Sequence, residues 1–301
     1  FDLNFTKSTM KNANKVSRSF QHMILLCGCL LIYYSVSARQ HKPTESGYIV
    51  QKTQGIDSDY VLIFNSYSES APWCRSLVDS TVMDLIKLSP QTMTVTQNLN
   101  SGLLRDEKAL AQLRQQVDVS YHDKPRMIIY IGSTSWPFLH ETIEKKWGKV
   151  PSIIFSDIDY TGPITNLLRK TPIAPALRIP YDKIVKEYEG ALSVVYMPIY
   201  LRQSLALMHQ LTPPMTELCF ISDTRWISAQ MRADMAAITK TDFPELKVRY
   251  LISADMSTLD LLDSLQHYGQ ETGVLFFSWL KQSQVGDSFV NDSHFRIIIS
   301  K

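Results

Sequence analysis

Hydrophobic and polar positions follow one another along the chain in an order that predicts strands alternating with helices. Residues 60–64 (YVLIF) form an apolar run without polar alternation, and residues 126–131 (RMIIYI) are nearly the same. Such runs are typical of strands covered on both faces in a parallel sheet. Each run ends in small and polar residues, and apolar residues at helical spacing come next. This order predicts an α/β fold built from successive βα units.

The first half of the chain contains four such units. Because parallel neighbours joined by helices need right-handed crossovers, this half should form one doubly wound layer. We predict strands over residues 60–64, 92–99, 126–131 and 152–155, with helices over residues 73–88, 106–117 and 136–147.

The pattern then pauses over residues 160–180, where four prolines interrupt it. We interpret this stretch as the crossover to a second lobe, so that residues 60–180 form the first α/β lobe and residues 181–301 the second. After an apolar run over residues 192–196 the alternation resumes, with strands over residues 217–221, 246–252 and 273–277 and helices over residues 198–211, 259–268 and around Met231 and Met235.

The predicted fold class is therefore α/β, with two doubly wound, Rossmann-like lobes and a cleft between them. The sequence stops within residues 294–301 (HFRIIISK), which have the pattern of a strand without its following helix. We therefore expect the second lobe to be truncated at its C-terminal end.

Residues 1–38 have the pattern of an export signal. The apolar or small residues 23–38 (MILLCGCLLIYYSVSA) follow four Lys or Arg side chains, with only Asp2 opposing them, and they end in Val-Ser-Ala. This arrangement is typical of a signal peptide, with a buried core helix as the alternative. The run is shorter than the ~20 residues of a spanning helix, so cleavage and retention as an N-terminal membrane anchor both stay open. Residues 39–59 are polar and predict a linker, with one short strand at residues 48–51.

Composition narrows the function classes. The 301 residues carry a formal net charge of +2 at pH 7, and setting residues 1–38 aside leaves 27 basic and 28 acidic side chains. No basic footprint for nucleic acid remains, and neither an anionic nor a cationic ligand is favoured. Beyond the export segment the cysteines are Cys74 and Cys219, in different halves, so we expect core burial rather than disulfides to stabilise the domain.

Motifs for cofactor or metal chemistry are not found in the sequence. It has no P-loop or G-x-S-x-G string, and none of the seven histidines forms an H-E-x-x-H motif. We expect no cofactor, no metal and no catalytic residue. One acidic pair, Asp157 and Asp159, follows a predicted strand and would suit a divalent ion in a sugar-transfer enzyme. A turn and helix-cap pair is the interpretation we favour.

Ligands of open α/β sheets bind at the carboxyl ends of the strands, so the polar and aromatic residues there are the candidate ligand-binding residues. The aromatic candidates could stack on a ligand and the polar ones could orient it, whereas a core, turn or cap role is the alternative for each. The candidates are Ser66, Tyr67, Trp73, Asn100, Ser133, Asp157, Asp223 and Trp279.

Two stretches carry a resemblance to a known family. Residues 61–73 (VLIFNSYSESAPW) and residues 197–223 (MPIYLRQSLALMHQLTPPMTELCFISD) resemble the periplasmic sensor domains of the ABC-transporter-substrate-binding type in bacterial membrane histidine kinases. The resemblance covers about residues 60–279. It implies a type I periplasmic-binding-protein fold, with a small molecule bound between the lobes and contacted by Ser66, Tyr67, Trp73 and Asp223. The chain departs from the family at residues 191–195, where a Thr-Gly is usual.

We therefore expect an extracytoplasmic small-molecule sensor domain of a two-component sensor histidine kinase in the cell membrane, facing the periplasm, with any kinase activity in a part beyond Lys301. A solute-binding protein of an ABC-type importer is the alternative, and a glycosyltransferase-like enzyme using Asp157 and Asp159 is the third hypothesis. The expected partners are a small-molecule ligand and the membrane, through the N-terminal segment, with no nucleic acid. A homodimer is one assembly compatible with this role.

Overall fold

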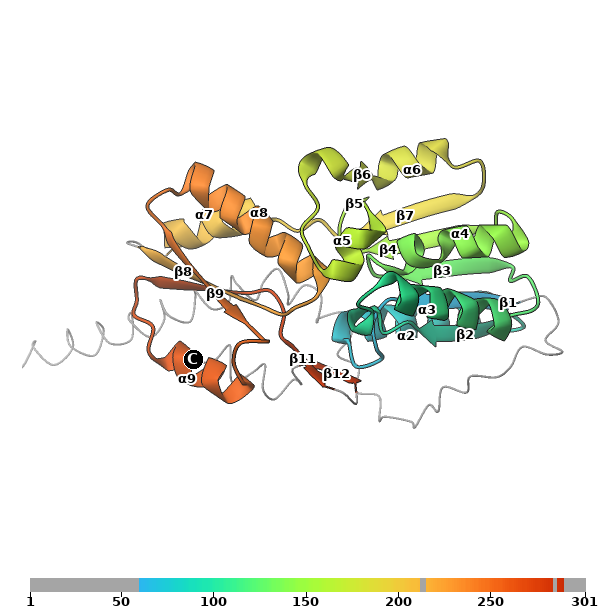
Figure 1. The fold of residues 1–301 in the computed structure, drawn as a ribbon, viewed down its shortest axis with the longest axis horizontal. Helices are drawn as coiled ribbons and strands as arrows, with labels where there is room; N and C mark the ends of the chain where they lie inside the picture. Colours follow the sequence, from blue (N-terminus) through green and yellow to red (C-terminus); the bar gives the residue numbers. More distant parts are fainter. Residues whose placement is uncertain (1–59, 212–214, 284–285, 290–301) are drawn as a thin grey trace, which may run out of the picture.

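A computed structural model describes residues 60–211, 215–283 and 286–289, which form two α/β lobes lying side by side (Figure 1). The first lobe contains a five-stranded parallel sheet of order β2-β1-β3-β4-β7. Its strands are β1 (Tyr60–Asn65), β2 (Met93–Asn98), β3 (Met127–Ile131), β4 (Ser152–Ser156) and β7 (Leu192–Tyr196). The predicted doubly wound first half is confirmed.

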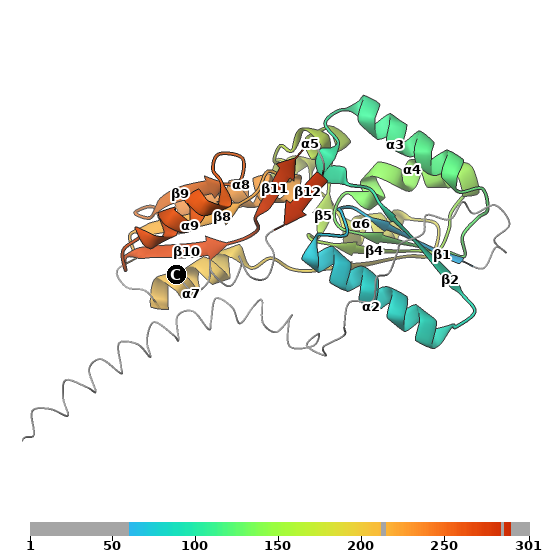
Figure 2. The same cartoon turned by 90° about the horizontal axis from the view of Figure 1, so that it is seen from below.

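Strand β1 is buried along its whole length between β2 and β3, as its apolar run predicts. Val61 and Ile63 face the layer that contains helix α2 (Pro72–Leu88), whereas Leu62 and Phe64 face the opposite layer. That opposite layer contains α3 (Glu107–Ser120) and α4 (Ser135–Trp147), and Figure 2 shows the helices on the two sides of the sheet. Burial on both faces explains why the strand has no polar alternation.

The proline-containing stretch 160–180 is not the crossover that we expected. It forms β5 (Tyr160–Thr161), α5 (Ile164–Arg169), the 3₁₀ helix η2 (Pro175–Leu177) and β6 (Ile179–Pro180), and β5 pairs with β6, so the stretch closes on itself. Helix α6 (Tyr181–Glu187) follows and leads back to β7, which pairs with β4. The chain therefore crosses to the second lobe after β7, at residues 197–200, and the first lobe extends to about residue 196 rather than 180.

The second lobe contains a three-stranded parallel sheet of order β10-β8-β9. Helices α7 and α8 cover one face of this sheet and α9 lies on the other, in agreement with the predicted βα series. The elements are α7 (Leu201–Leu211), β8 (Glu217–Ser222), α8 (Trp226–Asp242), β9 (Lys247–Ile252), α9 (Thr258–Gln266) and β10 (Thr272–Phe276).

After β10 the chain returns toward the first lobe. The hairpin β11 (Leu280–Ser283) and β12 (Gly286–Phe289) brings β12 against the 3₁₀ helix η1 (Ser101–Leu103) of that lobe. The predicted export segment, linker and final strand (residues 1–38, 39–59 and 294–301) lie outside the described residues. Among the helices within the described ranges, none has the length and hydropathy needed to cross a membrane.

A polar cluster between the two lobes

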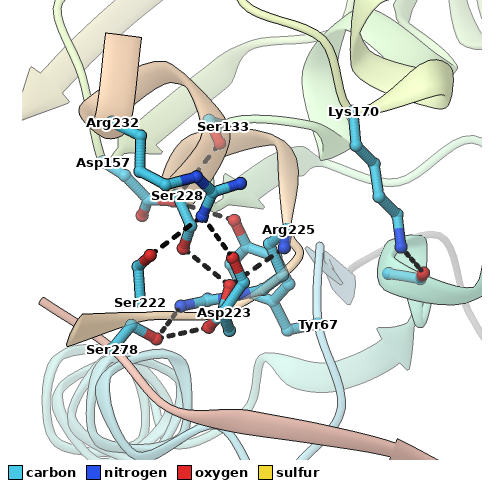
Figure 3. A network of polar contacts seen from close by, with 11 residues as sticks. Tyr67, Ser133, Asp157, Lys170, Ser222, Asp223, Arg225, Ser228, Arg232 and Ser278 are labelled. Atoms are coloured by element: carbon cyan, nitrogen blue, oxygen red, sulfur yellow. Dashed lines mark hydrogen bonds and ion pairs between the residues drawn. The ribbon is translucent and has the colours of Figure 1, made fainter. Parts of the chain in front are cut away.

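Side chains from strand ends of both lobes meet in one polar cluster (Figure 3). The first lobe contributes Tyr67 after β1, Ser133 after β3 and Asp157 after β4. The second lobe contributes Asp223 and Arg225 after β8 and Ser278 after β10. Because all of these strands are parallel within their sheets, their carboxyl ends lie together, as expected for the ligand side of an α/β fold.

On the first-lobe side, Asp157 is the common acceptor. The Tyr67 hydroxyl donates to its Oδ2 over 3.0 Å, and the Ser133 hydroxyl donates to the same oxygen over 3.2 Å. Burial raises the pKa of the Asp157 carboxyl above its usual value, although the Arg225 charge and the two hydroxyls act in the opposite direction. Asp157 therefore holds its proton more strongly than an ordinary surface aspartate does.

On the second-lobe side, Asp223 is fully buried and surrounded by donors. Arg225 Nε lies 2.9 Å from Oδ2, and the hydroxyls of Ser228 and Ser278 donate over 2.6 and 2.5 Å. Burial by itself would raise the pKa of Asp223, but the Arg225 charge and these hydrogen bonds outweigh it and hold the pKa below its usual value. Asp223 is therefore an ionised carboxylate.

Arg225 joins the two sides. Its guanidinium carbon lies 4.9 Å from the centre of the Tyr67 ring, in a cation–π contact between the lobes. The same guanidinium donates through Nη2 to the Ser278 hydroxyl over 2.5 Å. Arg232, on α8, holds the loop that follows β8, since its Nη1 donates to the Ser222 hydroxyl and to the Asp223 carbonyl. The cluster thus links the polar ends of both sheets through one arginine.

Helix α8 makes a second contact between the lobes. Gln230 accepts a hydrogen bond from the backbone N–H of Ile173 over 2.7 Å, and Asp234 pairs with Arg178 over 2.7 Å. Gln230 and Asp234 are four residues apart and therefore share one face of the helix. The Arg178 guanidinium in turn lies 4.6 Å from the centre of the Tyr160 ring. The 160–180 stretch is therefore the part of the first lobe against which α8 packs.

The loops that carry the first-lobe residues are held by Ser66. Its buried hydroxyl accepts the backbone N–H groups of Thr134 and Ser135, over 3.3 and 2.8 Å, at the start of α4. Gly132 precedes this turn with a φ of +86°, and a Cβ there would lie 2.7 Å from the Ser66 side chain. Ser66 thus positions the loop that contains Ser133.

The predicted candidates are only partly brought together. Tyr67, Ser133, Asp157 and Asp223 lie in the cluster, with Ser66 directly behind it. Trp73, on α2, packs against the apolar layer on one face of the first sheet. Trp279 is 2% exposed in the core of the second lobe, where its indole N–H donates to Thr258. For both tryptophans, packing in a core was the predicted alternative to stacking on a ligand, and this packing is what the structure has.

Asn100 has left-handed backbone geometry, with a φ of 47°, and precedes η1.

The two residues of the acidic pair, Asp157 and Asp159, lie in different environments. Asp157 belongs to the cluster, whereas the Asp159 side chain is exposed and its carbonyl accepts the Tyr181 N–H. Within the described part of the chain, no three His, Cys, Asp or Glu side chains are grouped closely enough to hold a metal ion.

Four cluster residues were not identified from the sequence: Arg225, Ser228, Arg232 and Ser278. The available signal was weak. Arg225 stands two residues after the candidate Asp223, and Ser278 directly precedes the candidate Trp279. An arginine or serine at such a position is common on any surface loop, so only the fold could select these residues.

Comparisons with known proteins identify no family for this chain. No family model matches the chain, and no curated protein matches it. One solved structure, described as the ABC domain in complex with L-Trp from Streptococcus pneumonia, is similar over 81% of this chain and 70% of that chain. The sequence identity is 12% and the TM-score is 0.44. The fold therefore rests on the topology described above, which is that of two Rossmann-like α/β lobes with parallel sheets.

Proposed function

We propose that this protein binds a small molecule at the junction of its two lobes and that it is the extracytoplasmic sensor domain of a membrane-bound histidine kinase. The observation that carries the binding part is the polar cluster, where strand ends from both lobes meet at Tyr67, Asp157, Asp223 and Arg225. A ligand at this position contacts both lobes at once. It therefore binds the closed arrangement more tightly than the open one, which is the condition for a ligand-driven switch.

The sensor part of the proposal is supported by the resemblance of residues 61–73 and 197–223 to periplasmic sensor domains and by the export pattern of residues 23–38. In this role the domain faces the periplasm, is attached to the cell membrane and passes lobe closure to a kinase. The solute-binding protein of an ABC-type importer is equally compatible with the fold. The gene sequence beyond codon 301 separates the two, because the sensor requires a membrane helix and a kinase there.

Ligand binding itself is tested by calorimetry and thermal shift on the full chain with a panel of sugars, amino acids and small aromatic compounds. We expect at least one compound to bind saturably and to lose affinity in Tyr67→Phe, which removes a hydroxyl at the junction. Lys87→Met, which removes an exposed surface pair with Asp84, is the control and should bind like the unaltered protein. The absence of any saturable binding, or equal affinity in Tyr67→Phe, would overturn the proposal.

A further inference from the structure

Arg232, on α8, is a half-buried arginine that forms no ion pair with an acidic side chain in the described part of the protein. The other two arginines at the contacts between the lobes differ from it, since Arg225 pairs with Asp223 and Arg178 pairs with Asp234. Arginines that are removed from water are usually paired with a carboxylate, because an uncompensated charge in such a place is unfavourable. Arg232 therefore has a positive charge without a counter-ion from the described chain.

The surroundings of Arg232 disfavour its charge. Burial lowers the pKa of Arg232 below its usual value, although Asp223, Tyr250 and Asp255 act in the opposite direction. The Asp223 carboxylate is already paired with Arg225, so it compensates the Arg232 charge only in part. An anion bound directly to the Arg232 guanidinium would therefore stabilise its charged form.

The hydrogen bonds of Arg232 leave one edge of its guanidinium free. Nη1 donates to the Ser222 hydroxyl over 2.9 Å and to the Asp223 carbonyl over 2.7 Å, so both of its N–H groups are used (Figure 3). The remaining N–H groups of the guanidinium, on Nε and Nη2, have no partner among the described residues. Nε and Nη2 form the edge of an arginine that binds a carboxylate through two parallel hydrogen bonds.

This free edge is accessible to solvent. Buried side-chain nitrogens without a partner do occur among the described residues, for example Nη2 of Arg114, but Nε and Nη2 of Arg232 do not belong to them. The Arg232 side chain is held by the loop at the carboxyl end of β8, the end of the strands at which α/β sheets bind ligands. The edge is thus fixed in position and within reach of a dissolved molecule.

The charges near Arg232 restrict the kind of anion that it can bind. Arg232 offers one positive charge, whereas Asp223 and Asp255 bring negative charge to its neighbourhood. A phosphate dianion would be repelled by these carboxylates more strongly than a singly charged carboxylate, whose two oxygens also match the fork of Nε and Nη2. A neutral molecule would leave the guanidinium charge without a counter-ion. The surroundings therefore favour a carboxylate.

Resting on the function proposed above, we propose that Nε and Nη2 of Arg232 bind the carboxylate group of a small organic acid at the carboxyl end of β8. The hydrogen bonds from Nη1 keep the guanidinium in place, and the opposite edge presents the charge and two donors to the acid. The proposal adds a ligand class, and a residue that contacts the ligand, to the binding function.

The test compares carboxylic acids with their amides, which keep the shape of the acid and lose the charge of its carboxylate. Calorimetry and thermal shift on the full chain at pH 7 use benzoate with benzamide, L-leucine with L-leucinamide, and inorganic phosphate. We expect at least one acid to bind saturably and its amide to bind about 10- to 150-fold more weakly, the effect of lost hydrogen bonds to a charged group. Phosphate should bind more weakly than that acid.

Two variants of Arg232 assign the effect to its guanidinium. Arg232→Met should raise the Kd of the acid by a similar factor and leave that of the amide unchanged. Arg232→Lys keeps the charge but cannot form two parallel hydrogen bonds, so its affinity for the acid should be intermediate. The matched control is Arg249→Met, because Arg249 pairs with Glu217 at the opposite, amino end of β8 and should not affect binding. The comparison of acid and amide in the unaltered protein applies even if Arg232→Met does not fold.

The outcomes separate this inference from the proposed function. Equal Kd values for each acid and its amide, or an unchanged Kd of the acid in both Arg232 variants, would overturn the inference and leave small-molecule binding intact. Binding of neutral compounds only, or of phosphate more tightly than every acid, would show that the ligand class is wrong. If neither these probes nor the panel described under the proposed function bind, the proposed function itself fails.

Discussion

Asp157 and Asp223 are both buried aspartates at the lobe junction, but their surroundings shift their pKa values in opposite directions. The pKa of Asp223 is lowered by Arg225 and two serine hydroxyls despite its burial, so its charge stabilises the fold above pH 3.8, its usual pKa, and this stabilisation is lost as the pH falls through the lowered value. The pKa of Asp157 is raised by burial, and its ionisation therefore has the opposite effect on stability. One guanidinium, that of Arg225, serves as the counter-charge for both.

Removal of Arg225 should be strongly destabilising. In Arg225→Met the fully buried Asp223 carboxylate loses its cation, and we expect the free energy of unfolding to fall by about 3–5 kcal/mol. Arg249→Met is the matched control, because Arg249 pairs with Glu217 at the surface and such pairs contribute little. Urea unfolding at pH 7 measures both. Similar losses in the two variants would contradict the importance of the buried pair.

The raised pKa of Asp157 predicts a pH effect with a defined sign. The folded protein binds this proton more tightly than the unfolded chain, so stability should decrease as the pH rises from 3.8 through the raised pKa. Asp157→Asn cannot ionise and should show a flatter dependence over that interval, in urea unfolding measured from pH 4 to pH 8. Asp159→Asn, at an exposed site nearby, should retain the original slope. Parallel curves for the Asp157→Asn and unaltered proteins would refute the prediction.

At the scale of single elements, the turn from β3 to α4 decides where the first-lobe site residues lie. Ser66, at the end of β1, accepts two backbone N–H groups from the start of α4, and Gly132 allows this close approach. The βα repeat was predicted correctly because apolar runs and helical spacing are local properties. The contact between Ser66 and residues 134 and 135 is not local, and no pattern in the sequence indicates it.

Two glycine substitutions separate backbone strain from steric overlap. Gly132 and Gly148 both have a positive φ, of +86° and +70°, but only a Cβ at position 132 would meet another side chain. Gly148→Ala should lose about 1–3 kcal/mol of stability from strain alone. Gly132→Ala should lose clearly more, because Ser66 must move as well. Thermal and urea unfolding measure both variants, and an equal loss would show that the turn accommodates the added methyl group.

At the scale of the whole molecule, the lobes are joined by side-chain contacts of Arg225 on Tyr67 and of α8 on the 160–180 stretch, and β12 also lies against η1 of the first lobe. The contact of α8 depends on an insertion that we had interpreted as the crossover between lobes. Its prolines interrupt helical and strand periodicity, but they do so within a small antiparallel closure of β5 and β6. Its packing partner, Gln230, is 57 residues away from Ile173 in the chain.

Weakening the α8 contact should favour an open arrangement of the lobes. In Gln230→Leu the backbone N–H of Ile173 loses its acceptor in a buried position, which costs the closed arrangement about 1–3 kcal/mol, or roughly 5- to 150-fold in the closed-to-open ratio. Small-angle X-ray scattering should show a larger radius of gyration. Lys149→Met, which breaks an ion pair with Glu189 within the first lobe, is the control. Identical scattering of all three proteins would show that this contact does not set the lobe arrangement.

The sequence by itself determined the succession of strands and helices, the α/β class and the strand ends at which polar residues gather, because these follow from patterns within about 15 residues. Tertiary structure decided which of those residues meet. Tyr67 and Asp157 are 90 positions apart, and Asp223 and Ser278 are 55 apart, so only the sheet order brings them together. The same long-range packing placed Trp279 in a core and Arg225 at the centre of the junction, since burial and charge pairing depend on neighbours that the local sequence does not specify.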